Sequence, residues 1–210
     1  MLLVDPLLYG FFIGAVFLLV LTPGPVVSLI IAETLSHSAR HGLAVVLGAA
    51  LSTTVMLVIY LLGFSTIIGE ISPPMFNVVR GVGAAYLMYL AIRAFRAKAN
   101  PAEMDGYSLE RTPAKAFRSA VIIGATNPKA ILFFAAFFPQ FIAADLEPAP
   151  QLNALALTFA VLAPALDGGW VLAAATARKF LMKQSSALLI NRISGSALAL
   201  GAVLLLFLNN

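Results

Sequence analysis

Two charged side chains lie deep inside apolar stretches of this sequence. Lys129 follows Asn127-Pro128 in a long hydrophobic run, and Asp167 lies among leucine, alanine and glycine residues. A charge inside a membrane-length apolar segment is costly, so such residues usually face a cavity and take part in transport. Their opposite signs favour a pair, and a buried carboxylate or amine can change its protonation during transport. Lys129 could instead extend its aliphatic stem to the lipid headgroups, an alternative that is harder for Asp167.

Two proline motifs interrupt the apolar segments that carry these residues. Proline lacks the backbone N–H and clashes with the carbonyl one turn back, so Thr22-Pro23-Gly24-Pro25 predicts a break in the first helix. In the second motif Asn127 precedes Pro128, where its side chain can cap the half-helix that follows. In hydrocarbon the freed carbonyls need partners, so a break must face protein or a watery cavity. A simple packing kink is the alternative reading.

A broken helix presents a new N-terminus inside the membrane, with free N–H groups and the positive end of the helix dipole. Such an end suits a carboxylate. Two of them predict a binding region near the bilayer midplane for an amino acid or a similar zwitterion, although they could hold only water and each other. Ser52 and Thr53 in the second helix could line a polar path, but membrane hydroxyls more often bond back to their own helix or to a neighbour.

The composition identifies the solvent that surrounds these segments. The 210 residues are 61% hydrophobic and 10% charged, whereas a soluble domain is about 45–50% apolar and about 25% charged. Too little polar surface remains to cover a water-soluble globule. The chain has no cysteine and two histidines, so neither a metal site nor a cofactor is expected. The net charge of +4 fits loop topology better than binding to nucleic acid.

Six segments are long and apolar enough to cross a bilayer, which takes about 20 residues. They are Leu7–Ile31, Gly42–Leu62, Phe76–Phe95, Ala116–Phe141, Leu152–Ala177 and Ile190–Leu208. We therefore expect an all-α integral membrane protein, with residues 1–210 forming a single membrane domain. The first segment lacks a preceding basic region, so we expect a retained helix and not a signal peptide.

The long loop 96–115 divides the chain into halves 1–95 and 116–210, each with three predicted helices. Because that number is odd, the second half must enter the membrane from the opposite side. The two halves are then inverted repeats whose first helices, helices one and four of the chain, are broken at the proline motifs.

The basic residues predict the orientation in the membrane. Nearly all Lys and Arg lie in or beside the first, central and fifth-to-sixth loops, whereas 63–75 and 139–151 carry acidic residues only. The positive-inside rule then places the central loop in the cytoplasm and both termini outside.

These features together resemble the LysE/RhtB (lysine exporter and homoserine-threonine efflux) superfamily. The resemblance covers essentially the whole chain and rests on Thr22-Pro23-Gly24-Pro25, on Asn127-Pro128-Lys129, on Gly42 and Gly48, and on the six segments with a basic central loop. It implies proton-driven export of amino acids or related metabolites across the bacterial inner membrane, with the two motifs as site residues. Some members carry an acidic residue early in helix two, where this chain has Ser52 and Thr53. That departure leaves Asp167 as the candidate carboxylate and puts a two-carboxylate mechanism in doubt.

The hypothesis is thus a secondary-active exporter working by alternating access, with a small-molecule substrate, a lipid environment and a homodimer as a further possibility. The substrate carboxylate would sit on backbone N–H groups near Gly24 to Val26 and near Lys129, and Asp167 would take the substrate ammonium or the coupling proton. Alternatives are export of a metal cation or a hydrophobic compound, an intramembrane enzyme, and a membrane scaffold. One acidic residue and no His or Cys in the predicted spans disfavour metal export, and the helices lack a paired-aspartate or Ser/Lys arrangement typical of an enzyme.

Overall fold

The computed structural model describes residues 4–22, 24–67 and 112–176, with isolated residues between 78 and 96 and between 192 and 203. Within this part every regular element is a helix, as the composition predicts. The elements are α1 (Pro6–Leu21), α2 (Pro25–Ser36), α3 (Ala39–Ile67), α5 (Pro113–Ala125), α6 (Pro128–Leu132), the π-helical turn η2 (Phe133–Phe137), the 3-10 turn η3 (Phe138–Phe141) and α7 (Pro148–Thr176).

Prolines mark where most of these helices start. The helices α1, α2, α5, α6 and α7 each begin on a proline, which lacks the N–H that a first-turn residue would leave unpaired. Side chains complete several starts: Asp5 accepts a hydrogen bond from the Leu8 N–H at 2.8 Å, and Thr112 caps α5. The local sequence therefore accounts for the segmentation of the chain.

Two of the six predicted spans correspond to helices of membrane length, and a third does so if a bent pair of helices counts as one span. The helices α3 and α7 are long and apolar enough to cross a bilayer, and the pair α1 and α2, bent by 52° at the first proline motif, reaches that length only when taken together. The fourth predicted span consists of α5, α6, η2 and η3 in succession, broken after Ala125. The predicted spans 76–95 and 190–208 lie outside the described residues, so the count of six stays a prediction.

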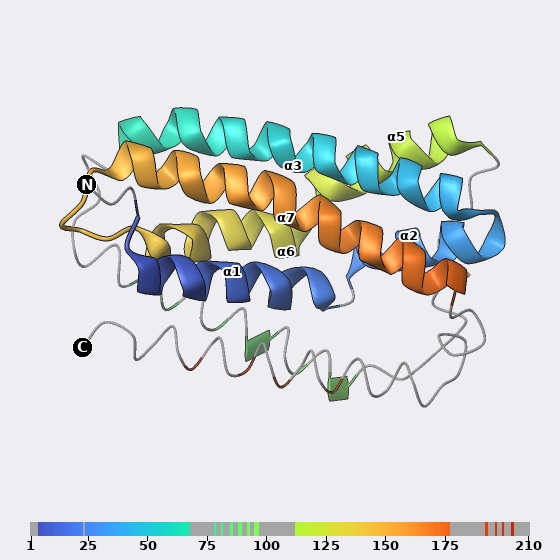
Figure 1. Ribbon diagram of the computed structural model, residues 1–210, viewed down its shortest axis with the longest axis horizontal. Coiled ribbons are helices and arrows are strands. Elements are labelled where there is room, and N and C mark those ends of the chain that lie inside the picture. Colours follow the sequence, from blue (N-terminus) through green and yellow to red (C-terminus); the bar gives the residue numbers. More distant parts are fainter. Residues whose placement is uncertain are drawn as a thin grey trace.

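The helices lie along a common long axis (Figure 1). The helix α3 packs against α2, α5 and α7, and α7 also packs against α1 and α2. The two broken segments run in opposite directions along the bundle: α1 leads into α2 toward one end, and α5 leads into α6 toward the other (Figure 1). Both breaks lie near the middle of the bundle's length in this view.

Two apolar clusters form the interior. The first, rich in phenylalanine, is made by α1, the second half of α3 with Leu57, the segment 133–141 and the first half of α7; its buried phenylalanines are Phe12, Phe133, Phe134, Phe138, Phe141 and Phe159. The second is made by α2, the start of α3, α5 and the second half of α7, and it includes Ile30, Val45, Ala120, Trp170 and Val171. Each cluster therefore lies on its own side of the helix breaks.

The outer surface of the long helices is also apolar. Large hydrophobic side chains are exposed along both α3 and α7, among them Leu47, Leu51, Ile59, Leu62, Leu157, Val161 and Leu172. A helix that is apolar on all sides is typical of a bilayer environment.

Close packing of α3 on α5 generates a stability prediction at Gly48. A Cβ placed there would lie 2.9 Å from the Ala120 Cβ and closer still to the Phe117 carbonyl oxygen. Gly48→Ala should therefore lower the free energy of unfolding by about 1–3 kcal/mol, because neither neighbour is the flexible end of a side chain. Thermal unfolding of the purified protein in detergent measures this.

The matched control is Gly10→Ala in α1, where no described atom would lie within 4 Å of the new Cβ. That change should leave the unfolding temperature unchanged or raise it, since alanine is the better helix former. Equal effects of the two substitutions would contradict the packing assigned to Gly48.

Candidate functional site

The polar residues singled out above lie between the two apolar clusters. On the broken first span the clusters are separated by Thr22 and Gly24, on α3 by Ser52, on the second broken segment by Asn127 and Lys129, and on α7 by Asp167. Four elements thus bring their polar residues to one level of the bundle. Polar groups at this depth need partners from protein or water.

The first break frees backbone carbonyls at the end of α1. The Leu19 carbonyl would normally accept from the N–H of residue 23, which is a proline and has none. The Thr22 N–H and hydroxyl both donate to the Leu18 carbonyl, at 3.1 and 2.6 Å. The carbonyls that follow Leu18 therefore require donors from elsewhere.

Lys129 supplies two of those donors. Its ammonium donates to the Leu19 carbonyl at 2.7 Å and to the Thr22 carbonyl at 2.8 Å, so it does not extend to the membrane surface. Gly24 allows the approach, because a Cβ there would lie 3.2 Å from Nζ and 3.4 Å from Cε of Lys129. The second motif thus bonds directly to the first, across more than 100 residues of sequence.

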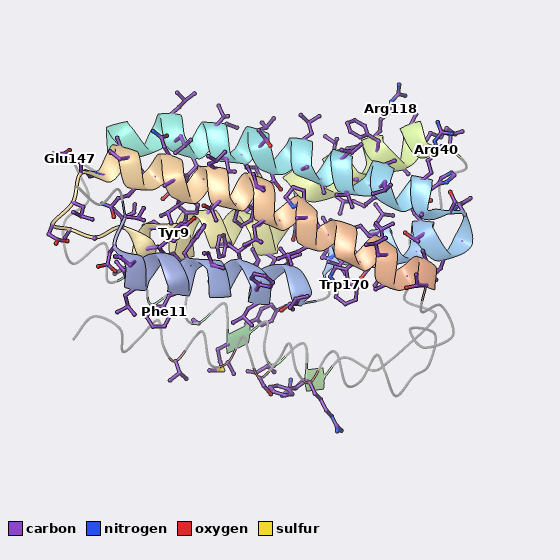
Figure 2. The ribbon with its side chains drawn as sticks, in the orientation of Figure 1. Tyr9, Phe11, Arg40, Arg118, Glu147 and Trp170 are labelled. Atoms are coloured by element: carbon purple, nitrogen blue, oxygen red, sulfur yellow. The ribbon has the colours of Figure 1, made fainter. Side chains whose placement is uncertain are left out.

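Trp170 on α7 satisfies a further carbonyl of the break. Its indole Nε1 donates to the Val20 carbonyl at 3.3 Å, and its side chain lies beside the end of α1 (Figure 2). This role was not predicted from the sequence. An indole on a span next to a predicted break is the signal that could have found it, since a buried indole N–H seeks an acceptor.

The start of α2, on the other side of the break, is open. The first-turn N–H groups of Gly24, Val26 and Val27 have no acceptor within the helix, and no side chain caps them. The helix dipole adds positive potential at this point. Within the described residues, the first break therefore combines carbonyls that are already occupied with N–H groups that can still bind an anion.

The second break is closed by its own residues. The Asn127 side chain accepts from the Lys129 N–H at 3.1 Å, and the Asn127 N–H donates to the Gly124 carbonyl at 3.2 Å. Asn127 is buried, and its capping role is the one its position before Pro128 predicts. The two breaks are consequently different in chemistry although both contain proline.

Asp167 lies on α7 at the level of the breaks, half-buried. Its charge interacts electrostatically with that of Lys129, although no salt bridge joins the two in the described part of the chain. No residue described here makes a hydrogen bond with its carboxylate. Asp167 therefore keeps its acceptor capacity while the Lys129 ammonium is bound to carbonyls.

Ser52 and Thr53 are at the same level of the bundle, but Ser52 is committed to packing. Its hydroxyl donates to the Ala49 carbonyl at 2.8 Å and lies against Gly124 of α5. This is the intrahelical bond that is the alternative to lining a polar path. Thr53 is only partly buried.

A buried acid that was not predicted from the sequence lies farther along α2. Glu33 is fully buried, and its Oε2 is 3.1 Å from Nδ1 of His37. The rings of His37 and His41 stack at 4.7 Å, and Ser38 is hydrogen-bonded to His41. The predicted first span stopped at Ile31, two residues before this acid. Its spacing of four from a histidine was the available signal.

Comparison with known proteins shows the family of the chain. The sequence model of the LysE type translocator family matches residues 17–208. The chain belongs to the LysE translocator family.

Relatives of this LysE-family chain include named efflux proteins. A leucine efflux protein of Klebsiella pneumoniae is 32% identical over 188 residues, covering 85% of this chain and 87% of that protein. An uncharacterized membrane protein of Vibrio cholerae is 30% identical over 176 residues, covering 84% of this chain and 85% of its own length. A leucine efflux protein of Salmonella typhimurium is 31% identical over 134 residues, 64% of this chain and 62% of that protein. No solved structure matches the chain.

The cap at the second break gives a testable prediction. Asn127→Ala removes the acceptor for the Lys129 N–H and should lower the free energy of unfolding by about 1 kcal/mol. Asn127→Ser is the matched control, because serine is an equally good N-cap and should restore most of the loss. Thermal unfolding in detergent compares the two variants. Identical unfolding temperatures for Ala and Ser would contradict the capping role.

Proposed function

We propose that this LysE-family protein is a secondary-active exporter of amino acids or related small metabolites, coupled to protons and working by alternating access. Family membership and the efflux relatives support the amino-acid substrate. The observation that carries the proposed site is the bond between the breaks: Lys129 of the second half holds the Leu19 and Thr22 carbonyls of the first. Leucine is the first substrate to test, because relatives of this chain are named leucine efflux proteins.

The substrate carboxylate binds at the start of α2 in this proposal. The uncapped N–H groups of Gly24, Val26 and Val27 favour an anion there, and the helix dipole adds to the attraction. Lys129 lies directly against Gly24, so the bound substrate would also lie beside the Lys129 side chain. Asp167, whose carboxylate accepts no hydrogen bond from the residues that the structure describes, takes the substrate ammonium or the coupling proton.

Alternating access between the two halves is the transport mechanism in this proposal. The two broken segments run in opposite directions (Figure 1), which supports an inverted repeat of residues 1–95 and 116–210. One apolar cluster lies on each side of the polar residues at the helix breaks. In this mechanism each cluster closes the entrance on its own side while the entrance on the other side is open. The halves rock about the breaks, where the helices are already interrupted.

We assign the protein to the bacterial inner membrane with both termini outside. Arg40 and Arg118 lie at one end of the bundle and Glu147 at the opposite end (Figure 2). The positive-inside rule makes the arginine end cytoplasmic. The exposed apolar side chains of α3 and α7 would then contact lipid.

Efflux from cells loaded with a panel of amino acids, leucine included, tests this function. The intact protein should accelerate efflux of at least one of them. Asp167→Asn should reduce that efflux by roughly tenfold to hundredfold, because a hydrogen bond to a charged group is worth about 1.5–3 kcal/mol. Asp145→Asn, in the exposed loop before α7, is the matched control and should leave efflux unchanged.

Two results would count against the proposal. If no amino acid leaves faster although the protein is correctly inserted, then the substrate is a different solute or the protein is a scaffold. If efflux is accelerated but Asp167→Asn transports normally, then Asp167 has no part in the mechanism.

A further inference from the structure

The Lys129 ammonium is bound by two main-chain carbonyls, those of Leu19 and Thr22, which we call the carbonyl pair. Two of its three N–H donors are used by the Leu19 and Thr22 carbonyls, at 2.7 and 2.8 Å. The carbonyl pair is available because Pro23 and the end of α1 leave those carbonyls without helical donors. Glycine at position 24 leaves room for a tetrahedral ammonium beside them. These two carbonyls therefore bind a primary ammonium group, that of Lys129, through two hydrogen bonds.

An amino-acid substrate carries the same group. Its α-ammonium has three donors and a positive charge, as the lysine ammonium has. If the substrate carboxylate binds the N–H groups of Gly24, Val26 and Val27, then the substrate ammonium lies next to the carbonyl pair, because Gly24 is in contact with Lys129. Two ammonium groups cannot occupy the same pair of carbonyls.

We propose that the Leu19 and Thr22 carbonyls are the ammonium site of the substrate, and that Lys129 occupies this site until the substrate displaces it. This inference rests on the proposed export of amino acids and assigns the ammonium to the carbonyls, which leaves the proton to Asp167. The displaced Lys129 moves toward Asp167. The two side chains already interact electrostatically, and the Asp167 carboxylate has no hydrogen bond within the described residues.

Displacement of Lys129 by the substrate would connect substrate binding to movement of the two halves. The Lys129 bonds join α6 in the second half to the end of α1 in the first. When the substrate ammonium replaces them, this link between the halves is lost, while the buried carbonyls remain satisfied. Only a substrate with a free ammonium can release the link, so deaminated or N-acylated analogues would not be transported.

The decisive measurement is binding of radiolabelled leucine, or of the amino acid that the efflux panel identifies, to the purified full-length protein. Lys129→Met keeps the length and apolar stem of the side chain and removes the competing charge. Its Kd should fall by roughly tenfold or more, because affinity is reduced in proportion to the fraction of protein in which the site is open. Transport by this variant should fall at the same time, since the link that the substrate must break is missing.

The matched control is Lys115→Met, an exposed lysine of α5 outside the site, which should leave Kd unchanged. Weaker binding by Lys129→Met would mean that Lys129 holds the substrate carboxylate and would overturn the proposal. An unchanged Kd would assign Lys129 a structural role only and would overturn it equally. If the intact protein neither binds nor exports any amino acid, then the proposed function itself fails.

A second measurement needs no variant and applies if Lys129→Met does not fold. Leucinol keeps the ammonium and lacks the carboxylate, whereas 4-methylpentanoate keeps the carboxylate and lacks the ammonium. Leucinol should displace bound leucine from the intact protein. At a roughly hundredfold higher concentration 4-methylpentanoate should fail to do so, which corresponds to a difference in binding free energy of about 2.7 kcal/mol or more. Equal displacement by both compounds would contradict an ammonium site at the carbonyls.

Discussion

A proline has no backbone N–H, and inside a bilayer no water replaces the missing donor. The Leu19 carbonyl loses its helical partner at Pro23, and the carbonyls up to Thr22 lose theirs as the chain turns away. Each unpaired group would cost several kcal/mol in hydrocarbon. The remaining structure must bring donors to this point, and the packing of the other helices around the break meets that requirement.

Two helices distant in sequence provide those donors. The helix α7 contributes the Trp170 indole to the Val20 carbonyl, and α6 contributes the Lys129 ammonium to the carbonyls on either side. Polar residues of four elements are thereby held at one level, with an apolar cluster beyond each side. The atoms that satisfy the break are thus the same atoms that form the proposed substrate site.

Local rules were sufficient for part of this description. The missing N–H of proline predicts the break after Leu21, and Asn127 before Pro128 predicts the cap. Neither rule states which distant side chain reaches the freed carbonyls, because that depends on how α6 and α7 pack against α1. For the same reason the sequence singles out Lys129 as a site residue but does not predict that its ammonium bonds to the Leu19 and Thr22 carbonyl oxygens. Glu33 escaped notice because its burial results from the packing of α2, which continues past the predicted span.

The difference between the breaks explains why binding is assigned to one of them. At the second break, the Asn127 side chain already occupies the position that an anion would take. At the first break, the residue in the capping position is Gly24, which has no side chain to occupy it. The same glycine lets Lys129 come close, so that the uncapped N–H groups of α2 lie beside the carbonyls that hold the Lys129 ammonium. In the proposed site the N–H groups would bind the carboxylate of an amino acid and the carbonyls its ammonium, whereas a simple anion or cation would use only one of the two sets of groups.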